Sequence, residues 1–321
     1  MISKATIDKI FSTIRVEEII GEYVQLKRAG SNFKGLSPFH EEKSPSFVVS
    51  PSKQIWKDFS TGKGGTAISF LMEIENFTYP EALRHAAKKY GIEIEEVVRL
   101  TNLYPDIIKI IAVGNEAMVK WAASYYVTPN IILKWVNHLQ DLKKQNKLPQ
   151  SVWITSSDNF ASWGGGDAEY HVEELKQLIK AVDYISMHTY PMHDTHYNPV
   201  FWGIKEDEQQ LSEKEKIDAA MLRARDYTIN QYENVVKYMK SIGVNKPVHI
   251  GETGWATQSN EHYGADGSKA TDEYKSAQFY NLMKEWTNKK GISCFYFEAF
   301  DENWKDAQNP KGSENHFGLI N

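Results

Sequence analysis

Two glutamates, each placed after an apolar run, are the residues of this sequence best suited to chemistry. Glu116 follows the run at 107–113, and Glu252 follows the run at 248–250. Paired carboxyl groups can cleave a glycosidic bond, because one protonates the leaving oxygen and then activates water while the other attacks the anomeric carbon. In retaining enzymes the two groups lie about 5–5.5 Å apart. We therefore predict that Glu116 and Glu252 are the carboxyl pair of one pocket.

Asn115 directly precedes Glu116 and adds weight to this hypothesis. A side-chain amide at this position can hydrogen-bond a sugar 2-hydroxyl, a contact that strengthens as the oxocarbenium-like transition state forms. An Asn-Glu pair by itself is more typical of a surface loop. The apolar run before it and the second glutamate at a matching position favour catalysis, so we expect Asn115 to bind substrate.

The elements that must position these residues are apolar runs that alternate with longer amphipathic stretches. The runs lie at 107–113, 152–155, 184–188, 248–250 and 294–297, and the stretches at 128–145, 170–181, 212–242 and 272–289. This alternation predicts parallel βα units, whose strands are apolar throughout because both faces are buried. Each run ends in polar residues, and active-site groups of a (β/α) barrel lie at that end of the strands. Both glutamates are therefore expected at the barrel mouth.

The first 96 residues have a different rhythm. Helical spacing at 3–20 is followed by short strand-like runs at 23–27, 32–35, 46–50 and 54–59, and then by helical stretches at 66–75 and 79–90. Turn signals such as Ala29-Gly30 and Ser44-Pro45 separate the strand-like runs. We therefore expect a small α+β domain over residues 1–96 and a larger α/β domain over residues 97–321.

Composition and charge narrow the functional classes. The chain has 321 residues, 41% hydrophobic and 25% charged, with one cysteine, which excludes an internal disulfide and a multi-cysteine metal site. No run of 18 apolar residues is present and the first residues carry charge throughout, so we expect no membrane partner, no secretory signal and a cytoplasmic location. The net charge of −5 falls on residues 97–321, and an acidic domain is a poor nucleic-acid binder.

Four ordered motifs make residues 97–321 resemble family 17 of the clan A glycoside hydrolases. They are VGNEA at 113–117, HIGETGW at 249–255, FDENWK at 300–305 and ENHFGL at 314–319. The resemblance implies a retaining enzyme acting on β-1,3- or β-1,3/1,4-glucan, as a glucan endo-1,3-β-glucosidase-like hydrolase or a glucanosyltransferase, with β-glucan oligosaccharide or polysaccharide as its partner. The family is usually exported.

The same resemblance implies that Glu116 is the acid/base and Glu252 the nucleophile, and it implies further roles around these carboxylates. Glu302, Lys305 and Glu314 match a charged cluster that supports the nucleophile. Tyr190 matches an aromatic residue of strand six near the sugar, and Trp255 would line the sugar site. If the run at 107–113 is strand four, the fold class is α/β with a partial (β/α)8 TIM barrel of strands 4–8, and strands one to three have no counterpart, which weighs against activity.

Residues 1–96 resemble the zinc-ribbon N-terminal domain of bacterial DNA primase. The matching stretches are GLSPFHEEKSPSFVVSPSKQIWKDFSTGKGGTAISFLM at 35–72 and FTYPEALRHAAKKYGIEIEE at 77–96. That family holds zinc with three cysteines and one histidine, whereas this sequence has Ser37, Asp58 and Thr61 at the cysteine positions and keeps only His40. A closed structural zinc site needs four N or S ligands, so we expect no metal and no cofactor. The ribbon should depend on a core of Phe39, Phe47, Ile55, Trp56, Phe59 and Phe70.

The primase resemblance makes single-stranded DNA a second candidate partner, through residues 1–96. Aromatic residues near lysines can form a platform on which bases stack, and the candidate residues are Lys53, Trp56, Lys57 and Lys63. Core packing explains the aromatic residues equally well. Three functions stay open: a glucan hydrolase or glucanosyltransferase, a primase-derived module that binds single-stranded template, and a non-functional fusion or gene-model artefact.

Overall fold

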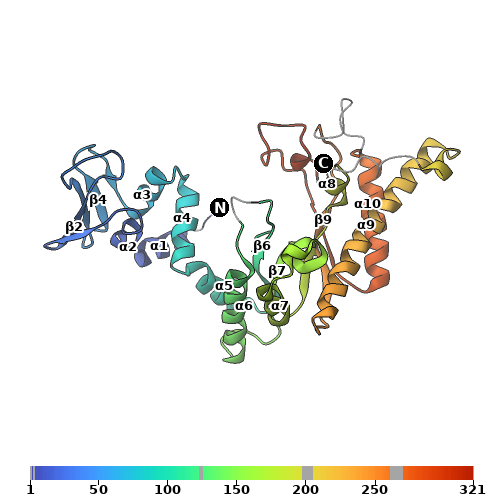
Figure 1. The fold of residues 1–321 in the computed structure, drawn as a ribbon, viewed down its shortest axis with the longest axis horizontal. Helices are drawn as coiled ribbons and strands as arrows, with labels where there is room; N and C mark the ends of the chain where they lie inside the picture. Colours follow the sequence, from blue (N-terminus) through green and yellow to red (C-terminus); the bar gives the residue numbers. More distant parts are fainter. Residues whose placement is uncertain (1, 3, 123–125, 197–204, 261–269, 321) are drawn as a thin grey trace. The chain divides into compact units, whose positions relative to one another are not determined.

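The computed structural model describes residue 2 and residues 4–122, 126–196, 205–260 and 270–320 (Figure 1). The chain divides into two compact units, Met1–Leu103 and Tyr104–Asn321. The first unit ends with helix α5 (Ile92–Leu103), which runs across the boundary expected at 96/97. The two units are described separately below.

The first unit combines five helices with a five-stranded antiparallel sheet of order β1-β2-β3-β4-β5. The strands are β1 (Lys27–Ala29), β2 (Asn32–Gly35), β3 (Phe47–Ser50), β4 (Ile55–Asp58) and β5 (Gly64–Gly65). The helices before α5 are α1 (Lys4–Thr13), α2 (Val16–Ile20), α3 (Ala67–Ile74) and α4 (Tyr79–Lys89). Helix α4 begins at a capping box, in which the Thr78 backbone N–H donates to Glu81, and Pro80 lies in its first turn, where no N–H is needed.

The core of the first unit is aromatic. The rings of Phe47 and Trp56 stack with centroids 5.2 Å apart, and Phe70 meets Trp56 edge-on at 5.6 Å. Two residues expected in this core are exposed instead: Ile55 keeps 40% and Phe59 keeps 69% of its surface. The alternation of a strand explains Ile55, because successive side chains of β4 point to opposite faces and Trp56 points inward.

The second unit contains a five-stranded sheet of order β10-β9-β8-β7-β6, and every neighbouring pair is parallel, as the βα rhythm predicts. The strands are β6 (Ile110–Asn115), β7 (Trp153–Asn159), β8 (Ile185–His188), β9 (Val248–Gly254) and β10 (Cys294–Phe297). The longer helices are α6 (Pro129–Lys144), α7 (Glu173–Ala181), α9 (Glu213–Ser241) and α10 (Glu273–Lys290). Short helical segments are η1 (Ala161–Gly165), η2 (Ala168–Tyr170), α8 (Pro191–His196), η4 (Glu206–Glu208) and η5 (Ser313–Asn315).

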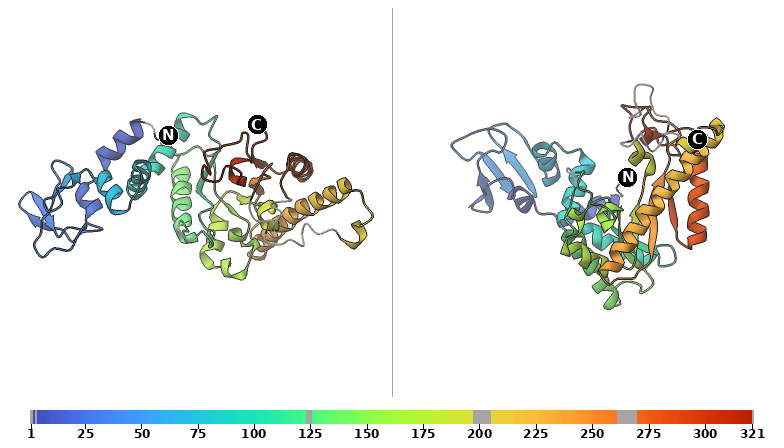
Figure 2. Two further views of the ribbon diagram at one scale, coloured as in Figure 1. Left: turned by 90° about the horizontal axis from the view of Figure 1, so that it is seen from above. Right: turned by 45° about the vertical axis from the view of Figure 1, so that its right-hand side comes forward.

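The two faces of this parallel sheet differ. One face is buried, with α6 packed on β6 and β7 and α10 packed on β9 and β10, and α9 and α10 lie side by side (Figure 2). Apolar side chains fill that face, among them Ile111, Ile154, Met187 and Ile250. Ser157, Ser186 and His188 lie on the opposite face, which also carries the half-exposed side chains of Ile110, Trp153 and Phe295.

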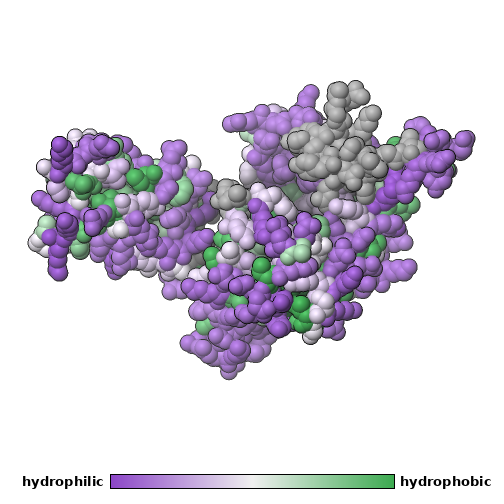
Figure 3. Space-filling model, viewed as in Figure 1, coloured by the Kyte–Doolittle hydropathy of each residue, from purple (hydrophilic) through white to green (hydrophobic). Residues whose placement is uncertain are grey.

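The molecular surface seen in Figure 3 is largely hydrophilic, with hydrophobic residues scattered over it. Within the described ranges, no helix has both the length and the apolar character that a bilayer crossing requires.

Candidate functional site

The carboxyl ends of the parallel strands bring together the two glutamates singled out in the sequence. Glu116 follows the last residue of β6, Glu252 lies in β9, and His188 at the end of β8 is aligned with Glu252. His188 Nδ1 lies 3.1 Å from Glu116 Oε1 and 3.9 Å from Glu252 Oε2. Those two carboxylate oxygens are therefore no farther apart than the sum of these distances. The glutamate side chains remain 33% and 27% exposed, whereas His188 is fully buried.

His188 is supported on its other side by two serines. Its Nε2 lies 2.7 Å from Ser157 Oγ, which lies 2.9 Å from Ser186 Oγ. Gly251 makes this packing feasible, because a Cβ at that position would lie only 2.0 Å from Ser186 Oγ and 2.7 Å from Ser157 Oγ. The glycine of the GETGW motif thus lets β9 approach the serines that hold the imidazole.

Tyr190 contacts Glu252 from the segment that follows β8. Its hydroxyl donates a hydrogen bond to Glu252 Oε1 at 2.5 Å. Burial and then the nearby charge of Glu252 raise the pKa of Tyr190 far above its ordinary value, so the phenol stays protonated and keeps donating. A hydrogen bond to an ionised acceptor is short and strong, so Tyr190 fixes the orientation of this carboxylate.

The backbone at Glu116 is strained. Its φ angle is +48°, in the left-handed region that side chains other than glycine rarely adopt, and its N–H donates to Ser157 O at 2.9 Å. Such conformations concentrate at functional sites. Asn115 lies exposed at the end of β6, one residue before this turn.

A charged cluster follows β10. Lys305 Nζ lies 2.7 Å from Glu298 Oε2 and 2.8 Å from Glu302 Oε2. Burial alone would lower the pKa of Lys305, but its two carboxylate partners raise it, so the ammonium stays charged. Burial raises the pKa of Glu298. Glu314 is exposed, and its charge contributes to the raised pKa of Tyr190, which places it near this side of the site.

Trp255 does not present a face to the strand ends. It is fully buried, its indole N–H donates to Ala270 O at 2.9 Å, and its ring packs on Phe279 with centroids 5.0 Å apart. The structure therefore places this residue of the GETGW motif in the hydrophobic core, behind the carboxylate that it follows in sequence.

Four polar residues at the strand ends were not singled out by the sequence reasoning: Ser157, Asp158, His188 and Glu298. The available signal was their position at the ends of the apolar runs. Asp158 is buried and accepts hydrogen bonds from the backbone N–H groups of Met118 and Asn159, each at 2.9 Å. Burial raises the pKa of Asp158 to about 6 despite these bonds.

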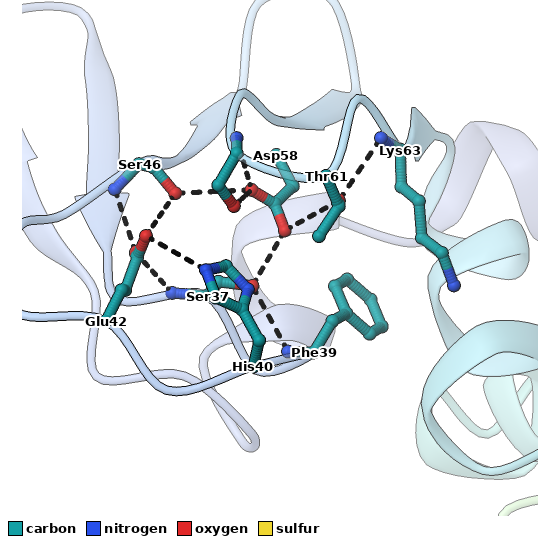
Figure 4. Close-up of polar contacts among 9 residues, drawn as sticks. Ser37, Phe39, His40, Glu42, Ser46, Asp58, Thr61 and Lys63 are labelled. Carbon is teal, nitrogen blue, oxygen red and sulfur yellow. Dashed lines mark hydrogen bonds and ion pairs between the residues drawn. The ribbon is translucent and has the colours of Figure 1, made fainter.

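The positions expected to replace zinc ligands in the first unit form a hydrogen-bonded cluster (Figure 4). Ser37 and Thr61 donate to Asp58, while His40 lies 3.6 Å from Glu42 and is 38% exposed. Neutral hydroxyls and a carboxylate already occupied by donors do not match the N and S ligands of structural zinc. Among the described residues, no group of three or more His, Cys, Asp or Glu side chains could hold a metal ion.

The residues expected to contact DNA do not form one surface platform. Trp56 is buried, and its indole N–H donates to Thr66 O at 3.0 Å. Lys57 Nζ donates to Gly62 O, and Lys63 Nζ pairs with Glu73 Oε2, both at 2.5 Å. Lys53 is exposed. Phe59 is a large exposed aromatic residue of this unit, and Lys63 Nζ lies 5.0 Å from the ring centroid of Phe39.

Comparison with known proteins defines the class of the second unit as a glycoside hydrolase domain. The chain belongs to the BtgE/BtgC glycoside hydrolase domain family, whose model matches residues 83–318. The crystal structure of an endo-laminarinase from Formosa Hel1_33_131 is 66% identical in sequence, with a TM-score of 0.70. The match covers 72% of this chain and 58% of the laminarinase chain.

The first unit has different relatives. The CHC2 zinc-finger model of the DnaG ribbon matches residues 2–102. A DNA primase of Geobacillus stearothermophilus is 50% identical over 93 residues, which are 29% of this chain and 16% of the primase. A DNA primase of Halalkalibacterium halodurans is 46% identical over 97 residues, 30% of this chain and 16% of the primase. The chain thus spans only a small part of these primases, and the two resemblances stated from its motifs are confirmed.

Proposed function

We propose that the second unit is a retaining glycoside hydrolase or glucanosyltransferase that acts on β-1,3-linked glucan. The observation that carries this proposal is the approach of Glu116 and Glu252 to the same imidazole nitrogen of His188. The endo-laminarinase that shares 66% of its residues over the matched region supports the substrate class. In this proposal β6 to β10 correspond to strands four to eight of a (β/α)8 barrel.

The chemistry divides between the two carboxylates. Glu252, oriented by the Tyr190 hydroxyl, attacks the anomeric carbon, and Glu116 donates its proton to the departing glycosidic oxygen. Glu116 then removes a proton from water for hydrolysis, or from a sugar hydroxyl for transfer, as that oxygen attacks the glycosyl-enzyme. Asn115, next to Glu116, is the candidate partner of the sugar 2-hydroxyl, and Lys305 holds the carboxylates of Glu298 and Glu302 in place after β10.

The test is cleavage of laminarin by the full chain, measured as release of reducing ends. Glu252→Gln and Glu116→Gln should each lower the rate at least about a thousandfold, since each removes one half of the carboxyl pair. Glu213→Gln is the matched control, because the Glu213 side chain is 86% exposed on α9, and its rate should be unchanged. Equal rates for wild type and both site variants would remove the assignment, and a wild type without turnover would contradict the proposed activity.

The products distinguish the two outcomes of the covalent intermediate. Nuclear magnetic resonance during the reaction should show the β-anomer first, as double displacement retains configuration. Oligosaccharides longer than the substrate would indicate transfer, and only shorter ones would indicate hydrolysis. An α-anomer as first product would contradict the role of Glu252 as nucleophile.

For the first unit we propose binding of single-stranded DNA, on the basis of the 50% identity to a primase segment and the exposed Lys53 and Phe59. Fluorescence anisotropy with a labelled oligothymidylate should show binding by the full chain that weakens as salt rises. Phe59→Ala should weaken it, because base stacking contributes about 1–3 kcal/mol per base. Phe11→Ala, which changes another exposed phenylalanine of this unit, is the control. No binding at low salt would exclude this function.

A further inference from the structure

The cluster around Asp58 has an unusual composition for a buried site. Asp58 has no exposed surface, and its two carboxylate oxygens accept from five donors (Figure 4). Ser37 Oγ and Thr61 Oγ1 donate to Oδ2 at 2.7 and 2.9 Å. Ser60 donates to Oδ1 from its hydroxyl at 2.5 Å and its backbone N–H at 3.0 Å, and Ser46 Oγ donates to Oδ1 at 3.2 Å.

A second carboxylate extends this network along the loop between β2 and β3. Glu42 Oε1 accepts from the backbone N–H groups of Ser37 at 2.7 Å and Ser46 at 3.0 Å. Glu42 Oε2 accepts from the Ser46 hydroxyl at 2.6 Å. Ser46 therefore lies between the two carboxylates and shares its single hydroxyl proton between them, with the shorter contact to Glu42, while His40 Nε2 lies 3.6 Å from Glu42 Oε2.

We propose that Asp58 performs in this chain the structural role that a zinc ion performs in the resembled ribbons. The carboxylate ties the loop before β3, through Ser37 and Ser46, to the turn after β4, through Ser60 and Thr61. The polarity of the site is inverted: a negative centre is surrounded by donors, where a zinc ribbon has a positive centre surrounded by acceptors. The ribbon therefore folds without metal.

The energetics agree with this role. A buried carboxylate without partners is strongly unfavourable, whereas charge-assisted hydrogen bonds are the strong kind. Burial alone would raise the pKa of Asp58, but the bonds from Ser60, Ser37 and Thr61 outweigh it and hold the pKa well below its usual range. The replacements at 37, 58 and 61 are also chemically linked, because hydroxyls at 37 and 61 supply the donors that a carboxylate at 58 needs.

The first test follows hydrogen exchange of β3 and β4 by mass spectrometry in the full chain. In wild type, exchange should be unchanged within about twofold by a chelator or by added zinc. Asp58→Asn keeps the shape but removes the charge, so exchange of these strands should accelerate by about tenfold or more. Ser37→Ala, which removes one donor, should give a smaller acceleration. Asp8→Asn, at an exposed position of α1, is the matched control and should change nothing.

The second test restores the ligand set of the resembled family. The triple variant S37C/D58C/T61C places three thiols in the positions that accompany His40, and it should bind one zinc ion per chain by elemental analysis. Wild type treated in the same way should bind none at that site. Loss of strand protection in wild type on chelation, full protection in Asp58→Asn, or a folded triple variant without zinc would each overturn the proposal.

Discussion

The Tyr190 hydroxyl donates to Glu252 Oε1 at 2.5 Å, which links the segment after β8 to the carboxylate of the neighbouring strand β9. The bond uses one oxygen of Glu252, while the other faces His188 Nδ1 at 3.9 Å. In the proposed reaction the nucleophile must be held at a defined angle to the anomeric carbon, and this pair of contacts restricts rotation of the Glu252 carboxylate.

Tyr190→Phe should lower kcat for laminarin by about tenfold or more, because a hydrogen bond to a charged group contributes about 1.5–3 kcal/mol. The loss should fall on kcat with little change in KM if the bond serves the reacting carboxylate. Tyr274→Phe is a matched control, since its hydroxyl also donates to a carboxylate, Asp218, at 2.5 Å but at an exposed position. Equal turnover by the two variants would contradict the role of Tyr190.

His188→Ala should reduce kcat/KM by about tenfold or more, because the imidazole is the common neighbour of both carboxylates. Ser157→Ala removes the bond to Nε2 and leaves the ring in place, so its effect should be weaker in the same direction. The rates of both variants are to be measured with laminarin beside thermal unfolding. An inactive Ser157→Ala variant together with an active His188→Ala variant would contradict the prediction that loss of the imidazole is the more damaging change.

Gly251→Ala should destabilise the second unit by about 1–3 kcal/mol, because the added Cβ would meet Ser186 Oγ at 2.0 Å. Adding Ser186→Ala removes that oxygen and should recover part of the loss, although Ser157 Oγ at 2.7 Å still opposes the methyl group. Urea unfolding of the two single variants and the double variant measures the coupling. If the two substitutions changed the free energy of unfolding additively, the close approach of the added Cβ to Ser186 Oγ would not be the cause of the destabilisation.

Asp158 should make the second unit less stable as the pH rises through about 6. Its pKa is raised from 3.8 to about 6 by burial, so the folded state binds the proton more tightly than the unfolded state does. The stability it provides is full below pH 3.8 and is lost above about 6, by about 3 kcal/mol. Asp158→Asn should remove this part of the pH dependence, measured by urea unfolding. If the free energy of unfolding depended on pH identically in wild type and in Asp158→Asn, the prediction for Asp158 would be wrong.

The parallel sheet could be predicted from the sequence because strands buried on both faces leave continuous apolar runs, and the polar residues after them mark one edge. The meeting of Glu116 with Glu252 at this edge follows from that geometry. His188 was harder to single out, because it ends a run that is otherwise apolar and its role depends on Ser157 from the next strand. A side-chain contact between neighbouring strands, such as that of His188 with Ser157, cannot be predicted from the spacing of residues along the sequence.

Side-chain direction accounts for the remaining differences. The GETGW motif does not reveal that Trp255 turns into the core against Phe279. The alternation of β4 could have assigned Ile55 to the exposed face, and with it the inward direction of Asp58. Loss of the zinc ligands was expected from their identities, but the five donors around Asp58 come from loops whose conformations the sequence does not determine.

Strand β6 is the outermost strand of its sheet and pairs only with β7 among the described residues. Glu116, the proposed acid/base, therefore directly follows a strand that is hydrogen-bonded on one side, whereas Glu252 lies in an interior strand. Edge strands fray more readily than interior ones, so the spacing between the two carboxylates should fluctuate mainly through movements of Glu116.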